Sequence, residues 1–448
     1  MTGSGIASAP QTVDLRDIVR DALELAERQG ASQTEVAVAD SSGFSATVRL
    51  GEVETVEHNR DKSLMLTVFF GHCSGSASTS DFTRAALEDT VRAACSIARY
   101  TAEDPHSGLA DPDLLATEFP DLDLYAPWDI EVDQAIELAA ACEQAARDED
   151  ARITNSEGAT VSTHTGREVY GNSLGFLGDA LGSRHTISCA VLGSLDDAMQ
   201  RDYWYTSARH PGDLEPGERI GRFAAQRTAR RLGSRRIATR QCPVLFEAPV
   251  AVSLIGHLVG ALRGSSLYRQ ASFLLGQLDK PLFQSGVRIH EQPHLPRGAG
   301  STAYDNEGVG TRDRDLVSDG ILTGYVLDSY SGRKLGMQTT GNAGGVHNLT
   351  LEAGTLGFEE LLREMGSGVL VTELIGQGVN TVTGDYSRGA AGFWVENGEI
   401  QYPVEEITIA GNLRDMYGKM NRVGSDVDTR GNLRSGSVLI DGVTVAGS

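Results

Sequence analysis

The sequence of 448 residues lacks any run of about 18 apolar residues, the length that a transmembrane helix needs. It also lacks a charged N-terminal stretch followed by an apolar segment, so no secretory signal peptide is indicated. Cysteine is scarce, and the five cysteines form no CxxC pair. They are Cys73, Cys95, Cys142, Cys189 and Cys242. An odd number of scattered cysteines is typical of buried, reduced thiols, so these absences predict a soluble cytoplasmic protein.

Basic residues are in short supply, with 39 lysines and arginines against 61 acidic residues and a formal net charge of −22. Such a chain repels phosphates, so the composition argues against a nucleic-acid or anionic-membrane binder. One basic cluster, between Arg227 and Arg240, holds six arginines and is more typical of a helix and loop surface than of an anion site. With 40% hydrophobic residues, the chain is long enough for two or three globular domains.

The first hundred residues alternate between helical and strand patterns. Apolar residues from Leu15 to Ala26 recur at helical spacing and end before Gly30, which predicts an amphipathic helix. Strands are predicted over 35–39, 44–50, 52–57 and 64–70, and a helix over 85–100. This order lacks strict β-α alternation and predicts an α+β domain over 1–104. Residues 105–127 combine four prolines with many acidic residues and are predicted to be a linker.

The rest of the chain divides at about residue 240. Residues 128–240 read as a middle α+β segment that continues the N-terminal half, with helices over 132–148 and 218–232 and strands over 160–170, 184–192 and 201–207. A short strand at 244–246 leads into a helix over 249–262, with Pro249 in its first turn. Glycines are dense between 298 and 411 and predict many short strands and turns rather than helices. We therefore predict the α+β class, an N-terminal α/β sandwich-like domain followed by a glycine-rich, mainly antiparallel β domain over 241–448.

The C-terminal region carries the most informative motif. Residues 377–392 form a glycine-rich loop, residues 393–400 read Phe-Trp-Val-Glu-Asn-Gly-Glu-Ile, and Tyr402-Pro403-Val404 follows. This run resembles the TldD/PmbA family of bacterial metallopeptidases, in the detail of its PmbA (also termed TldE) branch. The resemblance reaches most of the chain.

The resemblance implies a non-catalytic subunit. The family's TldD subunit carries a helix-borne His-Glu-x-x-x-His zinc motif, whereas the matching helix here reads Val252-Ser253-Leu254-Ile255-Gly256-His257. Only His257 remains of the motif. One imidazole cannot hold a zinc ion, and the glutamate that would act as general base is absent from this segment. We expect no catalytic residue, metal ligand or cofactor in this chain. A TldD-type partner would supply zinc, and the pair would hydrolyse unfolded or short peptides.

Three residues of the glycine-rich loop are candidate substrate contacts. Asp385, Tyr386 and Arg388 could bind a peptide carbonyl or terminus, or reach the partner's active site. Structural pairing within the loop is the alternative. In the family's active subunit the equivalent region helps to complete the metal site, but residues 387–392 hold no cysteine or histidine.

Other motifs favour structural roles. His290-Glu291-Gln292-Pro293-His294 satisfies His-Glu-x-x-His, but the motif works only on a helix, and Pro293 favours a strand that ends in a loop. The acidic segment at 304–308 lacks calcium-loop spacing and is more typical of a turn. His347, in a glycine-rich loop, is more typical of a turn between strands.

Two alternative functions stay open. The chain could be an independent metallopeptidase with non-standard ligands drawn from His257, His290, His294 and His347. Bound zinc in the isolated chain would favour that hypothesis. The chain could instead be a non-enzymatic regulatory protein, for instance one that modulates a toxin–antitoxin or RNA regulator, and direct binding without a partner subunit would favour this second hypothesis.

Overall fold

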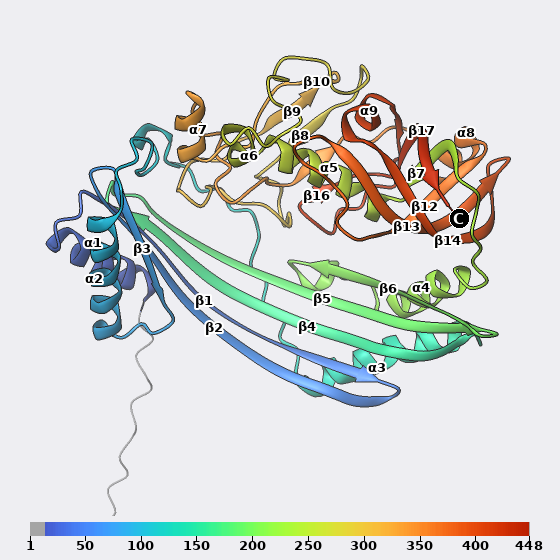
Figure 1. Ribbon diagram of the computed structural model, residues 1–448. Helices are drawn as coiled ribbons and strands as arrows, with labels where there is room; N and C mark the ends of the chain where they lie inside the picture. The colour runs from blue at the N-terminus through green and yellow to red at the C-terminus, as the bar shows by residue number, and fades with distance from the viewer. Residues whose placement is uncertain (1–13, 448) are drawn as a thin grey trace, which may run out of the picture.

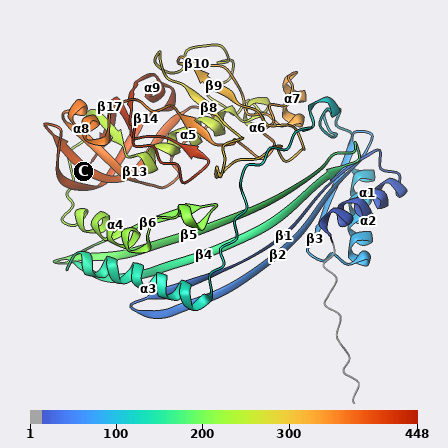
Figure 2. The same cartoon turned by 180° about the vertical axis from the view of Figure 1, so that it is seen from behind.

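A computed structural model describes residues 14–447 and shows two halves (Figure 1). A long, curved sheet with helices forms one half, and a C-terminal domain lies across from it. Figure 2, seen from behind, shows the same arrangement, with an irregular segment crossing between the halves. No helix among the described residues is long and apolar enough to cross a membrane.

The N-terminal half is built on one six-stranded antiparallel sheet of order β3-β2-β1-β4-β5-β6. Its strands are β1 (Gln33–Arg49), β2 (Glu52–Phe70), β3 (Cys73–Thr79), β4 (Ile153–Asn172), β5 (Leu177–Leu195) and β6 (Ala198–Ala208). Residues from both sides of the predicted linker therefore share a single sheet.

Two predicted breaks in these strands were wrong. The segment 35–39 and all of 44–50 except Leu50 belong to the continuous strand β1, and 52–57 and 64–70 belong to β2. The polar stretch around Asp40 does not end β1, because Asp40 lies opposite Lys62 in β2 and opposite Arg167 in β4. Oppositely charged neighbours stabilise a ladder that an apolar alternation would not predict.

Four helices cover one face of this sheet. They are α1 (Leu15–Arg28), α2 (Arg84–Tyr100), α3 (Val132–Glu149) and α4 (Gly217–Arg230), and each confirms a predicted helix. The first two pack against Val36 and Val38, and the other two pack against Ala46 and Val48. Side chains alternate along a strand, so the odd-numbered residues of β1, such as Glu35, face the opposite side, toward the C-terminal domain.

The predicted linker is irregular but firmly attached. Between α2 and α3 the chain holds one short 3₁₀ turn, η1 (Pro112–Leu114); a second, η2 (Pro211–Asp213), precedes α4. Leu115 forms a β-bridge with Val309. The Arg333 guanidinium donates hydrogen bonds of 3.0 Å to the carbonyls of His106 and Gly108. These contacts fix the segment on the C-terminal domain.

The C-terminal domain begins with β7 (Arg240–Phe246) and α5 (Ala248–Leu262). One sheet has the order β10-β9-β8-β11-β16, and the other β14-β13-β12-β7-β17-β15. The remaining strands are β8 (Ile289–Glu291), β9 (Arg314–Ser318), β10 (Ile321–Leu322), β11 (Leu349–Leu351), β12 (Gly368–Ile375), β13 (Asp385–Glu396), β14 (Glu399–Asn412), β15 (Met420–Val423), β16 (Leu433–Arg434) and β17 (Val438–Ala446). Most pairs are antiparallel, but β7 with β12 and β11 with β16 are parallel. The α+β class is confirmed.

The C-terminal domain also contains four further short helices, two of them within the range 298–411 where glycines predicted only strands and turns. They are α6 (Gly264–Tyr268), α7 (Ser329–Leu335), α8 (Phe358–Met365) and α9 (Leu413–Gly418). Local capping explains α7, because the Asp328 carboxylate accepts a hydrogen bond from the Ser331 amide and Gly336 ends the helix with a φ of 67°. The prediction without helices between 298 and 411 was therefore wrong for α7 and α8.

Candidate functional site: a cleft between the two halves

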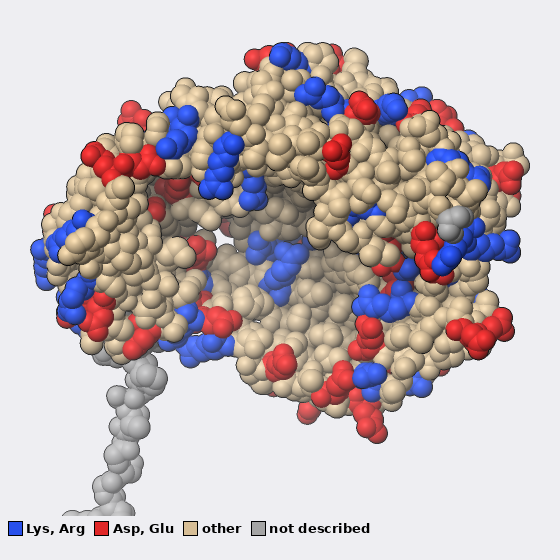
Figure 3. Space-filling model, viewed as in Figure 1, with Lys and Arg blue, Asp and Glu red and all other residues tan. Residues whose placement is uncertain are grey.

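A cleft separates the curved sheet from the C-terminal domain, and Figure 3 shows it as a deep hollow with charged side chains along its walls. Three adjoining cavities lie along this cleft. The sheet hollow (430 Å³) lies over β1, β2 and β4, and it shares Thr302, Tyr304 and Asn306 with the central hollow (650 Å³). The aromatic hollow (370 Å³), beside β6, shares Leu433 with the central one. Together they can hold an extended chain.

Helix α5 forms one wall of the cleft. Val252 and Ser253 line the aromatic hollow, and Gly256, Gly260 and Arg263 line the central hollow. Ser253, Gly256, Gly260 and Arg263 recur every three or four residues and so share one face, with Val252 beside it. The opposite face is fully buried in the core, with Leu254, Ile255, Leu258 and Leu262. Small residues of this largely apolar helix thus face the cleft, and its large aliphatic side chains face the core.

His257 lies beside this wall. Its ring centre is 6.0 Å from that of Tyr386, in an edge-on arrangement, and its Nε2 atom has no hydrogen-bond partner among the described residues. Burial lowers the pKa of His257, and the nearby Arg388 charge lowers it further. Within residues 14–447, no three metal-ligating side chains come together. His257 therefore lacks described neighbours with which to hold a metal ion.

The structure brings two of the three predicted substrate contacts together and directs the third away from them. All three residues lie at the start of strand β13 rather than in a loop, since this strand begins at Asp385. Asp385 is exposed, Tyr386 is only 1% exposed, and Arg388 lines the aromatic hollow. Burial raises the pKa of Tyr386 to about 12. Because side chains alternate along a strand, Tyr386 and Arg388 lie on one face of β13, where the Arg388 charge opposes the rise in the Tyr386 pKa, and Asp385 lies on the other face. The role of the three residues in substrate binding stays a prediction.

The His-Glu-x-x-His segment is a strand that ends in a loop, as predicted. Glu291 is buried and pairs with Arg314 at 2.7 Å, and it accepts a hydrogen bond of 2.6 Å from the backbone amide of His347. His290 is bonded to Gln292, and His294 to the Thr311 hydroxyl. These histidines do not converge on a common point, and Glu291 supports the loop that lines the central hollow.

The acidic segment at 304–308 is a turn, as predicted. Asp305 accepts hydrogen bonds from the backbone amides of Glu307, Val309 and Ala343. Burial raises the pKa of Asp305 to about 7. Burial also raises the pKa values of Glu35 and Glu168, which line the sheet hollow. The sequence analysis missed both glutamates. An acidic residue within a strand whose apolar residues alternate could have indicated a side chain that faces a cavity.

The arginine-rich segment joins the two halves. Arg227 lies 2.9 Å from Glu247, Arg230 lies 3.2 Å from the same carboxylate, and Arg231 pairs with Glu373. These guanidinium groups, at the C-terminal end of α4, therefore already have carboxylate partners in or next to the C-terminal domain. This pairing supports the structural interpretation of the cluster over an anion site.

Comparisons with known proteins agree with this architecture. Three family models match: PmbA/TldA metallopeptidase domain 1 over residues 34–98, the central domain over 125–232 and the C-terminal domain over 239–447. Among solved structures, a Bacteroides thetaiotaomicron protein described as a candidate modulator of DNA gyrase superposes with a TM-score of 0.93 and 28% identity, covering 98% of this chain and 100% of that one.

Full-length relatives identify the branch. Metalloprotease PmbA of Escherichia coli O157:H7 is 50% identical over 97% of this chain and 96% of its own length. A PmbA homologue of Haemophilus influenzae is 49% identical over 98% of this chain and 97% of its own length. By contrast, the TldD homologue of H. influenzae is 25% identical over 40% of each chain. The chain therefore belongs to the PmbA/TldD metallopeptidase family and lies in its PmbA branch.

Proposed function

We propose that this chain is the non-catalytic subunit of a two-subunit metallopeptidase. A TldD-type partner supplies the zinc ion and the catalytic glutamate, and this chain forms the second wall of an enclosed cleft. The observation that carries the proposal is the cleft-facing side of α5, where Val252 and Ser253 stand in place of the motif's first histidine and its glutamate. A single histidine, His257, cannot supply the ligands that a catalytic zinc site needs.

Unfolded or short peptides are the proposed substrates. The three hollows adjoin one another along the cleft, so an extended peptide can lie across them, whereas a folded domain is larger than any hollow. Polar backbone-lined walls bind a peptide main chain with little dependence on its sequence. We place the complex in the cytoplasm, consistent with the five unpaired cysteines.

The co-occurrence of the two kinds of chain supports a TldD-type partner. H. influenzae carries both a PmbA homologue and a TldD homologue, so the two kinds of chain occur in one organism. The test is to purify this chain alone, the TldD-type partner alone, and the two together. Zinc content and hydrolysis of an unfolded peptide are then measured for each preparation. A Glu-to-Gln variant of the partner's motif serves as the control.

Zinc-free, inactive material from this chain alone, together with activity of the pair, would support the proposal. Stoichiometric zinc and chelator-sensitive hydrolysis by the single chain would refute the proposal and favour an independent metallopeptidase with non-standard ligands. The second candidate, a regulatory binding protein, is favoured by the description of the B. thetaiotaomicron relative as a candidate gyrase modulator. Binding of gyrase by this chain alone, with no peptidase activity in the pair, would favour that candidate.

A further inference from the structure

We propose that the central hollow is a carboxylate-binding site, in which Arg263 holds the C-terminal carboxylate of a bound peptide. The identity of the ligand as a peptide rests on the proposed function. The binding step itself involves no hydrolysis and no metal, so it can be tested on this chain alone.

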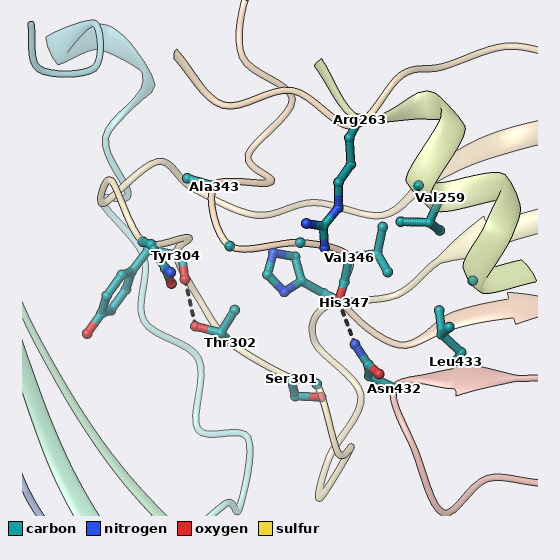
Figure 4. A pocket seen from close by; sticks show the side chains of 16 residues that line it. Val259, Arg263, Ser301, Thr302, Tyr304, Ala343, Val346, His347, Asn432 and Leu433 are labelled. Carbon is teal, nitrogen blue, oxygen red and sulfur yellow. Dashed lines mark hydrogen bonds between the residues drawn. The ribbon is translucent and has the colours of Figure 1, made fainter. Parts of the chain in front are cut away.

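Arg263 projects into the hollow from a fixed point of the backbone. The residue ends α5 and also precedes α6, and its carbonyl accepts a hydrogen bond of 3.1 Å from the Leu267 amide. The adjoining Gly264 amide donates to the Val326 carbonyl at 2.9 Å. Figure 4 shows the side chain reaching down beside His347. The junction of the two helices thus positions the guanidinium group.

The guanidinium group has no partner among the described residues. Figure 4 draws no hydrogen bond to it, and no carboxylate of residues 14–447 lies within ion-pair distance. Elsewhere in the cleft the pattern differs, since Arg227 pairs with Glu247 at 2.9 Å and Arg430 with Asp428 at 2.7 Å. Arg263 is therefore available for a ligand.

The lining of the central hollow contains no acidic side chain. Sixteen described residues form it, and none is aspartate or glutamate, although the chain holds 61 acidic residues. His347 adds no charge at neutral pH, because burial lowers its pKa and its Nε2 atom donates a hydrogen bond to the Gly341 carbonyl. The positive charge of Arg263 must be matched by water, by salt or by a ligand.

The chemistry of the site selects a carboxylate. The planar fork of a guanidinium group matches the two oxygens of a carboxylate, and its single positive charge balances the single negative charge of that group. The adjoining loop passes close by: a Cβ atom on Gly344 would lie 2.6 Å from the Asn306 amide nitrogen, so the glycine leaves that amide accessible. A volume of 650 Å³ accommodates the last residues of a peptide.

A carboxylate could come from a chain end or from an acidic side chain, and three peptides distinguish these sources. One labelled hexapeptide has a free C-terminus and no acidic residue, the second is its C-terminal amide, and the third is an amide that contains one glutamate. Fluorescence anisotropy measures their binding to the full chain. We expect the free-ended peptide to bind at least about tenfold more tightly than either amide, as a charge-assisted hydrogen-bonded pair predicts.

Variants of Arg263 test whether this residue causes the preference for a free C-terminus. Arg263→Gln is expected to remove the preference for the free end, and Arg263→Lys to retain part of it. Arg269→Gln is the matched control, since Arg269 is also exposed, but its guanidinium lies 5.5 Å from the Tyr268 ring and outside the hollow. Thermal unfolding midpoints verify that each variant folds.

Equal binding of the free-ended peptide and its amide to the unsubstituted chain would overturn the proposal. An unchanged preference in a folded Arg263→Gln variant would overturn it as well, and equal binding of the glutamate-containing amide would overturn the chain-end assignment. Peptide hydrolysis by the complex is measured separately. An inactive complex whose single chain still prefers free carboxylates would refute the proposed function and leave this inference intact.

Discussion

The guanidinium carbon of Arg430 lies 4.0 Å from the centre of the Trp204 ring and 4.3 Å from that of Tyr205. Arg430 belongs to the C-terminal domain, and both aromatic residues belong to β6. Its Nη1 atom also donates a hydrogen bond of 3.1 Å to the Tyr205 carbonyl, and Asp428 neutralises its charge. This arrangement joins the two halves at one end of the cleft.

Arg430→Ala should weaken the attachment of the two halves. The substitution removes the cation–π contact and leaves the partly buried Asp428 carboxylate unpaired, so we expect a loss of about 2–4 kcal/mol in unfolding free energy. Arg430→Lys retains the charge but loses the planar stacking, and we expect a smaller loss. Urea unfolding followed by tryptophan fluorescence measures both.

The control for this prediction is Arg20→Ala, because Arg20 is exposed and, within residues 14–447, pairs only with Asp17 on its own helix. We expect a change below about 0.5 kcal/mol there. Equal stability of the Arg430→Ala and Arg20→Ala variants would contradict the role assigned to Arg430.

A buried carboxylate in α3 holds the turn between β1 and β2. Glu143 is 1% exposed and accepts hydrogen bonds from the backbone amides of Leu50 at 2.8 Å and Gly51 at 2.9 Å. Glu143→Ala leaves these amides without a partner, and we expect a loss of about 1–3 kcal/mol. Glu137→Ala, an exposed site on the same helix, is the control with little expected change. Hydrogen exchange at Leu50 and Gly51 should quicken only in the first variant.

The same turn contains a residue in an unfavourable conformation. Leu50 has a φ of 54° and is 49% exposed, and Gly51 follows with a φ of 81°. Asparagine tolerates the left-handed region better than leucine, so Leu50→Asn should stabilise the protein by about 0.5–1 kcal/mol. Leu50→Ala lacks the short polar side chain that lets asparagine hydrogen-bond locally in this region, and it gains no comparable relief. A chemical denaturation midpoint for Leu50→Asn that does not exceed that of Leu50→Ala would refute this explanation.

Helix positions were predictable, but strand lengths were not. The prediction over 132–148 nearly matches α3 (Val132–Glu149), because helical periodicity and end signals are local. The full length of β1 depends on Asp40 lying opposite Lys62 and Arg167, which come from distant parts of the chain. A polar residue within a strand reads as a break until its cross-strand neighbours are known.

The candidate site likewise combines features that the local sequence predicts with features that depend on distant residues. The absence of two motif residues at Val252 and Ser253 was readable in the sequence, since a motif is a local pattern. The availability of Arg263 was not, because its surroundings combine α5 with loops near Thr302, Gly345 and Asn432. Only the tertiary arrangement shows that these segments contribute no carboxylate.

The stability of the fold should depend on the protonation of His185. This residue is fully buried, its Nδ1 atom lies 2.9 Å from the Thr163 hydroxyl, and its Nε2 atom donates to the Ala126 carbonyl at 2.8 Å. Burial is the main cause that lowers its pKa below the ordinary value of 6.5. The unfolded chain therefore binds the proton more readily, and the stabilising contribution of neutral His185 is lost as the pH falls below about 6.5.

His185→Gln removes this titration while retaining an amide that can donate to Ala126. The variant should be less stable than the unsubstituted protein at pH 8, because the Thr163 contact is disturbed, and the difference in unfolding free energy should narrow between pH 7 and pH 5. Groups that titrate in both proteins, such as His347 and Asp305, cancel in this difference. Urea unfolding at several pH values measures it, and a difference that stays constant or widens toward pH 5 would show that His185 is not held neutral by the fold.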